Sequence, residues 1–140
     1  MGFFIPMGMY WDNRVDISEL IGKTITEIEG CHAYSDTIKF RCSDGSEYVM
    51  YHNQDCCEDV SVEEVFGDVR NLIGFPIVMA ECVAETGNPK DIYDDSCTWT
   101  FYKLATIMGY VTIRWYGSSN GCYSEEVDLV RVKEPAKVEE

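Results

Sequence analysis

The chain has 140 residues, of which 46% are hydrophobic and 13% aromatic, and it carries 25 acidic against 11 basic side chains. Its length is that of a single domain, and its apolar content is too high for an intrinsically disordered protein. The formal charge of −14 disfavours direct binding to nucleic acid, because phosphates would repel the surface, and no apolar run reaches the roughly 20 residues of a membrane-spanning helix. We therefore expect one domain over residues 1–133 and a charged tail over residues 134–140, with neither nucleic acid nor membrane as a partner.

The first elements follow from capping and alternation. Asp16 precedes Glu19 by three residues, ahead of an apolar pair, which predicts a short helical turn over residues 15–21. Residues 23–29 and 37–42 alternate between apolar and polar side chains, as half-buried strands do. The dipeptide at residues 44–45, Asp-Gly, is a strong hairpin signal and predicts a return strand over residues 46–52.

The central segment has the periodicity of an amphipathic helix. Ser61 and Glu64 form a capping-box pattern at its start, and Gly74 and Pro76 mark its end. The pattern predicts a helix over residues 62–73. Its apolar stripe consists of Val62, Val65, Phe66, Val69, Leu72 and Ile73.

The rest of the chain predicts strands over residues 77–85, 97–107, 110–116 and 122–132, with a long loop of turn formers over residues 86–96. Hairpin-length connections make the sheet antiparallel. We therefore predict an α+β fold, in which a mainly antiparallel sheet of about six to seven strands carries the one amphipathic helix on one face.

Alternation also assigns side chains to faces of this sheet. In the strand over residues 97–107, we expect the face with Trp99, Phe101, Ala105 and Ile107 in the core, together with Val111, Ile113 and Trp115 of the next strand. The opposite face then presents an exposed mixture typical of interfaces, with Tyr102, Tyr110, Arg114 and Tyr116.

Two blocks of uncommon residues stand out, HNQDCCE at residues 52–58 and TWTFYKLATIMGYVTIRWYGSSNG at residues 98–121. They resemble a family of small phage-encoded proteins, a domain of unknown function in tailed phages, and the resemblance extends over roughly residues 15–132. In that family two tyrosines follow the second block, whereas this chain has Cys122 and Tyr123. The resemblance implies a viral protein acting in the cytosol of a bacterial host, and it brings no activity, cofactor or catalytic residue.

The chain has seven cysteines, and two of them, Cys56 and Cys57, are adjacent. An odd number with no secretory leader ahead of it is typical of reduced thiols in a cytosol. The short apolar start over residues 1–9 is interrupted by Pro6, so we expect an anchor or a strand end there.

Charge is unevenly distributed along the chain. Between Arg41 and Arg70 there is no Lys or Arg, but there are eight acidic residues, which together predict a local negative field. We therefore predict a non-enzymatic binding protein, without a cofactor, that acts on a host cytosolic factor with a basic surface, such as a defence component. Exposed sheet edges would also allow a homodimer. The candidate binding residues are Asp55, Glu58, Asp59, Glu63, Glu64, Tyr102, Arg114, Tyr116 and Asn120.

A second hypothesis is a protein that sequesters a signalling nucleotide. Arg114 would pair with a phosphate and Tyr116 would stack on the base. Hydrogen bonds to the base edge would come from His52, Asn53 and Gln54.

A third hypothesis is a metal-dependent hydrolase centred on residues 52–58. His52, Asp55, Cys56 and Cys57 are common ligand types, but zinc sites usually separate their cysteines by two to four residues. Adjacent cysteines usually point in different directions, so these four residues are weak candidates for a metal site.

Overall fold

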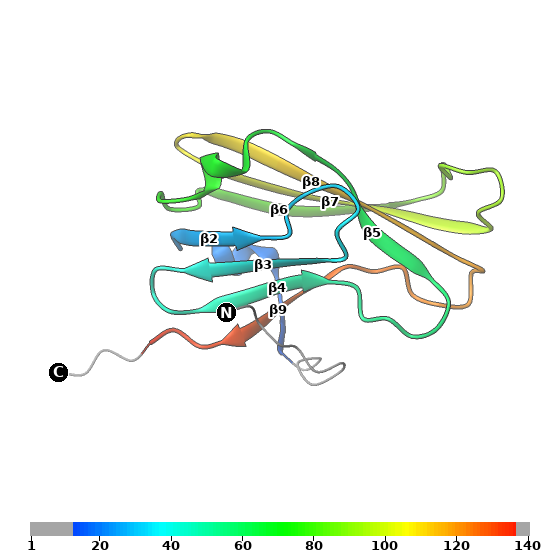
Figure 1. Cartoon of the computed structure of the whole chain (residues 1–140), viewed down its shortest axis with the longest axis horizontal. Helices are drawn as coiled ribbons and strands as arrows, with labels where there is room; N and C mark the ends of the chain where they lie inside the picture. Colours follow the sequence, from blue (N-terminus) through cyan, green and yellow to red (C-terminus); the bar gives the residue numbers. More distant parts are fainter. Residues whose placement is uncertain (1–12, 137–140) are drawn as a thin grey trace.

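The structure, a computed structural model, describes residues 13–136 as two antiparallel sheets packed face to face (Figure 1). The five-stranded sheet has the order β1 (Arg14–Val15), β9 (Asp128–Lys133), β4 (Glu47–Tyr51), β3 (Thr37–Cys42) and β2 (Ile25–Glu29). The four-stranded sheet has the order β5 (Asp59–Phe66), β8 (Gly109–Ser119), β7 (Ser96–Thr106) and β6 (Met79–Thr86). Two short 3-10 helices, η2 (Ile17–Leu20) and η3 (Val69–Leu72), lie between strands.

The fold class is therefore all-β, and the predicted α+β fold is wrong. Within residues 14–136 the helical elements are η2 and η3, each a single turn of four residues. No helix in this part of the chain has the length and apolar character of a membrane span. The expectations for residues 1–9 and for the end of the tail, residues 137–140, lie outside the described residues.

The predicted helix over residues 62–73 is in fact the second half of β5 followed by η3. Pairing of β5 with β8 shifts register between Val62 and Glu64, which marks a β-bulge. A bulge adds one residue to the two-residue alternation, so the inward side chains Val62 and Val65 are three apart, the spacing that a helix would also give. Ser61 lies within β5, and the residue that caps η3 is Asp68, whose carboxylate accepts a hydrogen bond from the Arg70 amide at 3.0 Å.

Other patterns in the sequence are confirmed. In β3 the alternating residues Ile38, Phe40 and Cys42 are buried. The hairpin that joins β3 to β4 turns at Gly45, which has the positive φ of 89° that favours glycine. The long β7–β8 hairpin also forms, and its pairing extends to Ser96 and Ser119, beyond the predicted ends.

The core lies between the two sheets and contains their inward side chains. Trp115 of β8 is fully buried, and its indole N–H donates to the Met50 sulfur of the facing sheet at 3.3 Å. Val111 and Ile113, also predicted as core residues, are fully buried beside it. The inner face of β8 was therefore predicted correctly.

The predicted inner face of β7 is wrong. Tyr102 is only 3% exposed and belongs to the core, whereas Trp99 and Phe101 lie on the outer face of the sheet. The hydroxyl of Tyr102 donates to the Val127 carbonyl at 2.9 Å, so this polar group is satisfied inside the protein. Tyr102 is therefore not available as a binding residue.

Candidate functional site

The polar segment between β4 and β5 turns inward. The side chain of Glu58 is fully buried, and its Oε1 accepts hydrogen bonds from the Cys56 amide at 2.8 Å and from the Gln54 side chain at 2.8 Å. The Asp55 amide adds a third, longer hydrogen bond at 3.2 Å. Glu58 therefore holds this segment in shape and does not contribute to an exposed negative field.

His52 packs against Glu58 and completes the same structural unit. Its Nδ1 lies 2.7 Å from the Glu126 carbonyl oxygen, which can only accept, so Nδ1 carries a hydrogen. Its Nε2 lies 3.4 Å from Oε2 of Glu58, and neither atom has another hydrogen-bond partner among the described residues.

Opposing effects act on the carboxyl group of Glu58. Burial alone would raise its pKa, because the charged form loses hydration. Hydrogen bonds from the backbone amides of Cys56 and Asp55, with the contact to His52, outweigh burial and hold the pKa below the ordinary value of 4.5.

The structure does not support a metal site at the weak candidate residues, and it does not support a single nucleotide site at the residues proposed for one. A disulfide joins Cys56 to Cys57, and no group of three or more His, Cys, Asp or Glu side chains suited to a metal occurs among residues 13–136. His52 and Gln54 are engaged with Glu58, while Arg114 lies on the outer face of the four-stranded sheet. Arg114 is therefore not brought together with His52 and Gln54.

Arg114 is the centre of an ionic and aromatic cluster on that outer face. Its guanidinium bonds Glu63 at 2.6 Å and Glu64 at 3.2 Å, and it lies over the rings of Phe66 and Trp99 at 4.9 and 5.3 Å. Trp99 in turn meets Tyr116 edge-on, with ring centroids 4.6 Å apart. This cluster neutralises two of the predicted field carboxylates.

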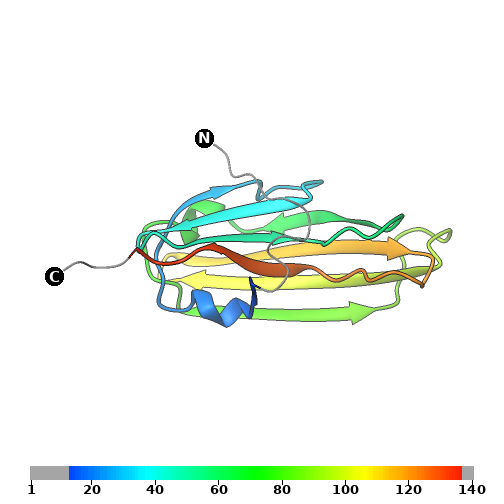
Figure 2. The same ribbon diagram turned by 90° about the horizontal axis from the view of Figure 1, so that it is seen from below.

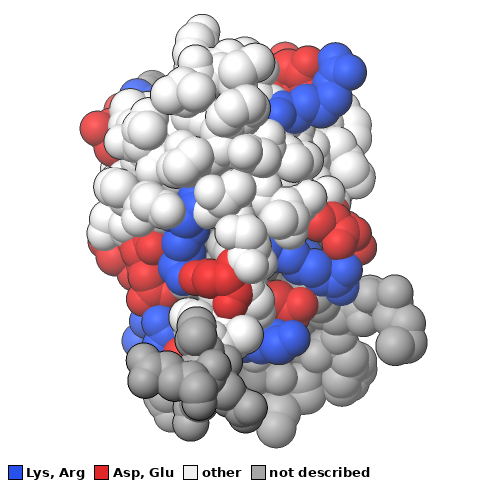
Figure 3. Space-filling model, turned by 90° about the vertical axis from the view of Figure 1, so that its left-hand side faces the viewer, with Lys and Arg blue, Asp and Glu red and all other residues white. Residues whose placement is uncertain are grey.

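Most of the acidic residues between Arg41 and Arg70 are likewise paired. Five have a Lys or Arg within 4 Å, and a sixth, Glu58, is buried against His52. At the end of the molecule seen in Figure 3, acidic and basic side chains lie next to one another and leave a broad uncharged area above them. The expected continuous negative flank is therefore not formed. The five paired carboxylates are those of Asp44, Glu47, Glu63, Glu64 and Asp68.

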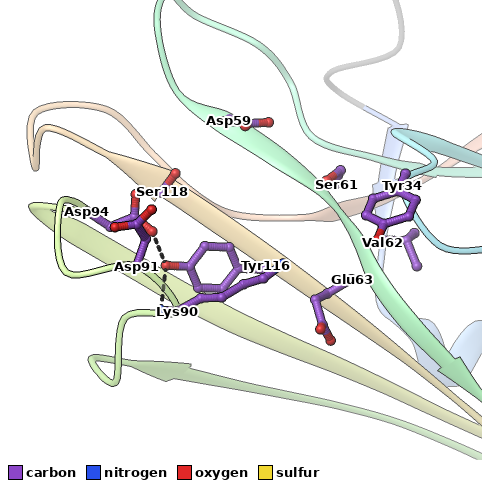
Figure 4. A pocket seen from close by; sticks show the side chains of 10 residues that line it. All are labelled: Tyr34, Asp59, Ser61, Val62, Glu63, Lys90, Asp91, Asp94, Tyr116 and Ser118. Atoms are coloured by element: carbon purple, nitrogen blue, oxygen red, sulfur yellow. Dashed lines mark hydrogen bonds between the residues drawn. The ribbon is translucent and has the colours of Figure 1, made fainter.

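Negative charge gathers instead in a groove of about 380 Å³ at the opposite end, which we call the acidic groove (Figure 4). The strands β5 and β8 form one side, and the loop between β6 and β7 forms the other. Four carboxylates line the groove against one basic side chain, Lys90. Its lining residues are Tyr34, Asp59, Ser61, Val62, Glu63, Lys90, Asp91, Asp94, Tyr116 and Ser118.

Tyr116 holds the loop in place along the groove. Its hydroxyl accepts a hydrogen bond from the Lys90 amide at 3.0 Å and donates to the carboxylate of Asp94. Burial and the hydrogen bond to Asp94 raise the pKa of Tyr116, so its hydroxyl keeps its proton as a donor. The Lys90 ammonium lies 5.7 Å from the ring centroid of Tyr116.

Two neighbouring hollows extend the acidic groove. One of about 450 Å³ shares Tyr34, Asp59 and Ser61 with it and adds Asp36, His52, Gln54 and Val60. The other, of about 220 Å³, shares Asp94 and Ser118 and adds Asp95 and Asn120. Both hollows therefore adjoin the acidic groove, and carboxylates line all three.

Among the predicted binding residues, Asp59, Glu63 and Tyr116 line the acidic groove, and Asn120 lines the adjoining hollow. Asp55 is exposed but lines none of these hollows. The candidate residues chosen from sequence did not include Tyr34, which lies between β2 and β3, or the carboxylates of the β6–β7 loop, Asp91 and Asp94, because that segment was interpreted only as a loop of turn formers. The density of acidic residues in the loop was the signal that could have identified it.

The geometry defines an all-β sandwich with a groove that is lined by four carboxylates and one basic side chain. A family model described as a domain of unknown function (DUF7448) matches residues 18–129, and the chain belongs to that family. The expected membership in a domain family of unknown function is thus confirmed. No curated protein and no solved structure matches the chain.

Proposed function

We propose that this protein is a non-enzymatic binding protein that captures a basic segment of another protein in the acidic groove. The carrying observation is the excess of four carboxylates over one ammonium group along a groove that also presents tyrosine rings. Carboxylates of this kind accelerate encounter with a cationic surface, and aromatic rings provide contact area and cation–π attraction.

Some carboxylates of the groove already have a partner within the protein, and others do not. Glu63 is paired with Arg114, and Asp94 accepts a hydrogen bond from Tyr116. Asp59 and Asp91 have no basic partner among residues 13–136, so they are the carboxylates that a Lys or Arg of the partner would meet.

Three of the five free cysteines are poorly suited to nucleophilic catalysis. Burial raises the pKa of Cys31 to about 11, and it also raises the pKa of Cys42 and Cys82. A thiol with a raised pKa is a poor source of the thiolate that a cysteine nucleophile needs.

The biological setting is part of this proposal. The resemblance of two sequence blocks to phage-encoded proteins supports action in a bacterial cytosol, with a host factor such as a defence component as the basic partner. An acidic protein of charge −14 can occupy a basic surface that otherwise binds nucleic acid.

The test is affinity capture from host lysate with wild-type protein and two double variants. Asp59→Asn/Asp91→Asn removes the two unpaired groove charges, and Glu126→Gln/Glu134→Gln removes two exposed charges that line no part of the groove. The captured protein is then identified and titrated by calorimetry at low and high salt. We expect the groove variant to bind about five- to tenfold more weakly, with a smaller salt dependence, and the control to bind as wild type. Equal binding by both variants would exclude the groove.

A further inference from the structure

One long edge of the sandwich is open. β6 ends the four-stranded sheet and pairs only with β7, and its other side forms no backbone hydrogen bond within residues 13–136. Figure 2 shows β6 along the margin of the molecule, with η2 beside its first residues only. From Glu81 to Thr86 every residue of the strand is exposed.

The other edges of the two sheets are partly covered or short. Outside β5, the Tyr34 amide donates to the Val62 carbonyl and the Val62 amide donates to the Ser35 carbonyl, each at 2.7 Å. Outside β2, the Gly74 amide donates to the Ile25 carbonyl at 2.9 Å. The remaining edge is β1, which has only two residues.

β6 also lacks a bulge, a proline or a lysine that would protect it as an edge strand. It pairs with β7 over eight residues without a register shift, and its sequence, MAECVAET, contains neither Pro nor Lys. An exposed, regular edge of this kind is a template for an added strand.

The side chains of β6 show what kind of strand would fit. Glu81, Val83 and Glu85 share the outer face, because they lie opposite Lys103, Phe101 and Trp99 of β7. The inner face has the small residues Cys82 and Ala84. Neither Glu81 nor Glu85 forms an ion pair in the described part of the chain, although Lys103 stands across from Glu81.

We infer that the open edge of β6 is a docking site for an extended, basic segment of another protein, which adds to the four-stranded sheet as a fifth strand. Residues four apart in the added strand place cationic side chains opposite Glu81 and Glu85, and the residue between them packs on Val83, which is 41% exposed. The backbone supplies affinity through ladder hydrogen bonds, and the two carboxylates select for positive charge.

A second copy of this chain fits the edge less well. Antiparallel pairing of two β6 strands about Val83 would place Glu81 of one copy opposite Glu85 of the other, and each copy has a formal charge of −14. Like charges directly opposite each other in a sheet are destabilising.

This site is separate from the acidic groove and does not depend on it. None of the residues that line the groove belongs to β6. A partner could use both surfaces, but each can be disabled without the other.

The probe is the peptide acetyl-Thr-Lys-Thr-Val-Thr-Lys-Thr-amide, with hydrogen exchange and calorimetry as readouts. We expect slower amide exchange within residues 79–86 and no change in the β6–β7 loop. The same peptide with Glu in place of Lys should bind at least about tenfold more weakly. Of two versions N-methylated on alternate amides, one should lose binding and the other keep it, because only alternate amides face β6.

Variants complete the test. Glu85→Lys should weaken the Lys peptide about fivefold, and Glu81→Lys less, because Lys103 already offsets Glu81. Glu126→Lys makes the same charge change on an exposed residue far from β6 in sequence and should leave binding unchanged. Asp59→Asn/Asp91→Asn should also leave binding of the Lys peptide unchanged, which separates this site from the groove.

Three results would overturn the inference. Exchange protection in residues 59–63 or 87–95 would show that the peptide is attracted to the groove, and equal binding of both N-methylated versions would exclude strand addition. Protection of residues 79–86 that rises with protein concentration, without peptide, would assign the edge to a second copy.

Discussion

The segments 52–58 and 87–95 are both polar connections rich in carboxylates, yet they use these groups in opposite ways. In the first, Glu58 is buried and accepts hydrogen bonds from Asp55 and Cys56 amides. In the second, Asp91 and Asp94 face a groove at the surface. The two segments differ in the hydrogen-bond donors near their carboxylates. A carboxylate with several backbone amides and an imidazole nearby can be buried, whereas a carboxylate with few donors nearby stays in solvent, where a partner can bind it.

The largest expected effect concerns residues 52–58, which we call the inward segment, in contrast to the outward segment over residues 87–95. Glu58→Ala leaves two amides and His52 without their acceptor in a buried place, so we expect it to lower the free energy of unfolding by about 3 kcal/mol. Glu58→Gln should cost much less, because its oxygen can still accept and its NH₂ can donate to Nε2 of His52.

Chemical denaturation measures both changes. The matched control is Asp55→Ala, in the same segment but exposed, which should stay within about 0.5 kcal/mol of wild type. If Glu58→Ala lowered the free energy of unfolding as little as Asp55→Ala, Glu58 would not be a buried structural acceptor, and the contrast between the two segments would fail.

The comparison also depends on β5 being a strand, since β5 joins the inward segment to the groove. Gly67 follows β5 with φ of 96°, and an added Cβ would lie 2.5 Å from the Tyr110 carbonyl oxygen. We expect Gly67→Ala to destabilise the protein by about 2 kcal/mol or more. In a helix the same substitution would stabilise by about 1 kcal/mol, so the sign of the change decides between the two structures.

Gly74→Ala is the control for Gly67. Its φ of 90° is similar, but no atom lies within 4 Å of an added Cβ. It should therefore show only the cost of the backbone conformation, about 1 kcal/mol, in the same denaturation experiment.

A smaller effect is expected where Tyr116 anchors the outward segment. Tyr116→Phe removes the hydroxyl that bonds the Lys90 amide and Asp94, so the free energy of unfolding should fall by about 1 kcal/mol. Amide exchange should accelerate within residues 87–95 and not within residues 52–58. Tyr93→Phe, whose side chain is 84% exposed in the same loop, should change neither quantity.

The smallest effect is the contribution of Glu58 to the pH dependence of stability. Because its pKa is lower in the folded protein than the ordinary 4.5, its contribution is present above that value and is lost as the pH falls through the folded pKa. Wild type should therefore lose stability more steeply than Glu58→Gln between about pH 6 and about pH 3. Parallel curves for the two proteins would show that Glu58 does not titrate differently on folding.

Prediction from sequence succeeded where neighbouring strands follow each other along the chain. The alternation of Ile38, Phe40 and Cys42 and the pairing of β7 with β8 depend on local pattern and turn chemistry. The helix over residues 62–73 failed because a bulge in β5 gave inward residues a spacing of three.

The candidate site was predictable only in part, because some of its residues come from segments that are distant in sequence. Asp59, Glu63 and Tyr116 were recognised from charge and aromatic content, but Tyr34 and Asp91 reach the acidic groove from segments that are distant in sequence. Alternation showed that Tyr102 and Trp99 lie on opposite faces of β7, yet only the position of the facing sheet decided that Tyr102 is the buried one.

By itself the sequence determined the acidic composition, the alternation of most strands and the hairpin turns, because these depend on composition and on contacts between near neighbours. The tertiary structure alone decided which face of β7 is buried, which carboxylates are paired, and that β6 is left as an open edge. Those outcomes depend on which donors, cations and strands from distant parts of the chain come within a few ångströms, and no local pattern contains that information.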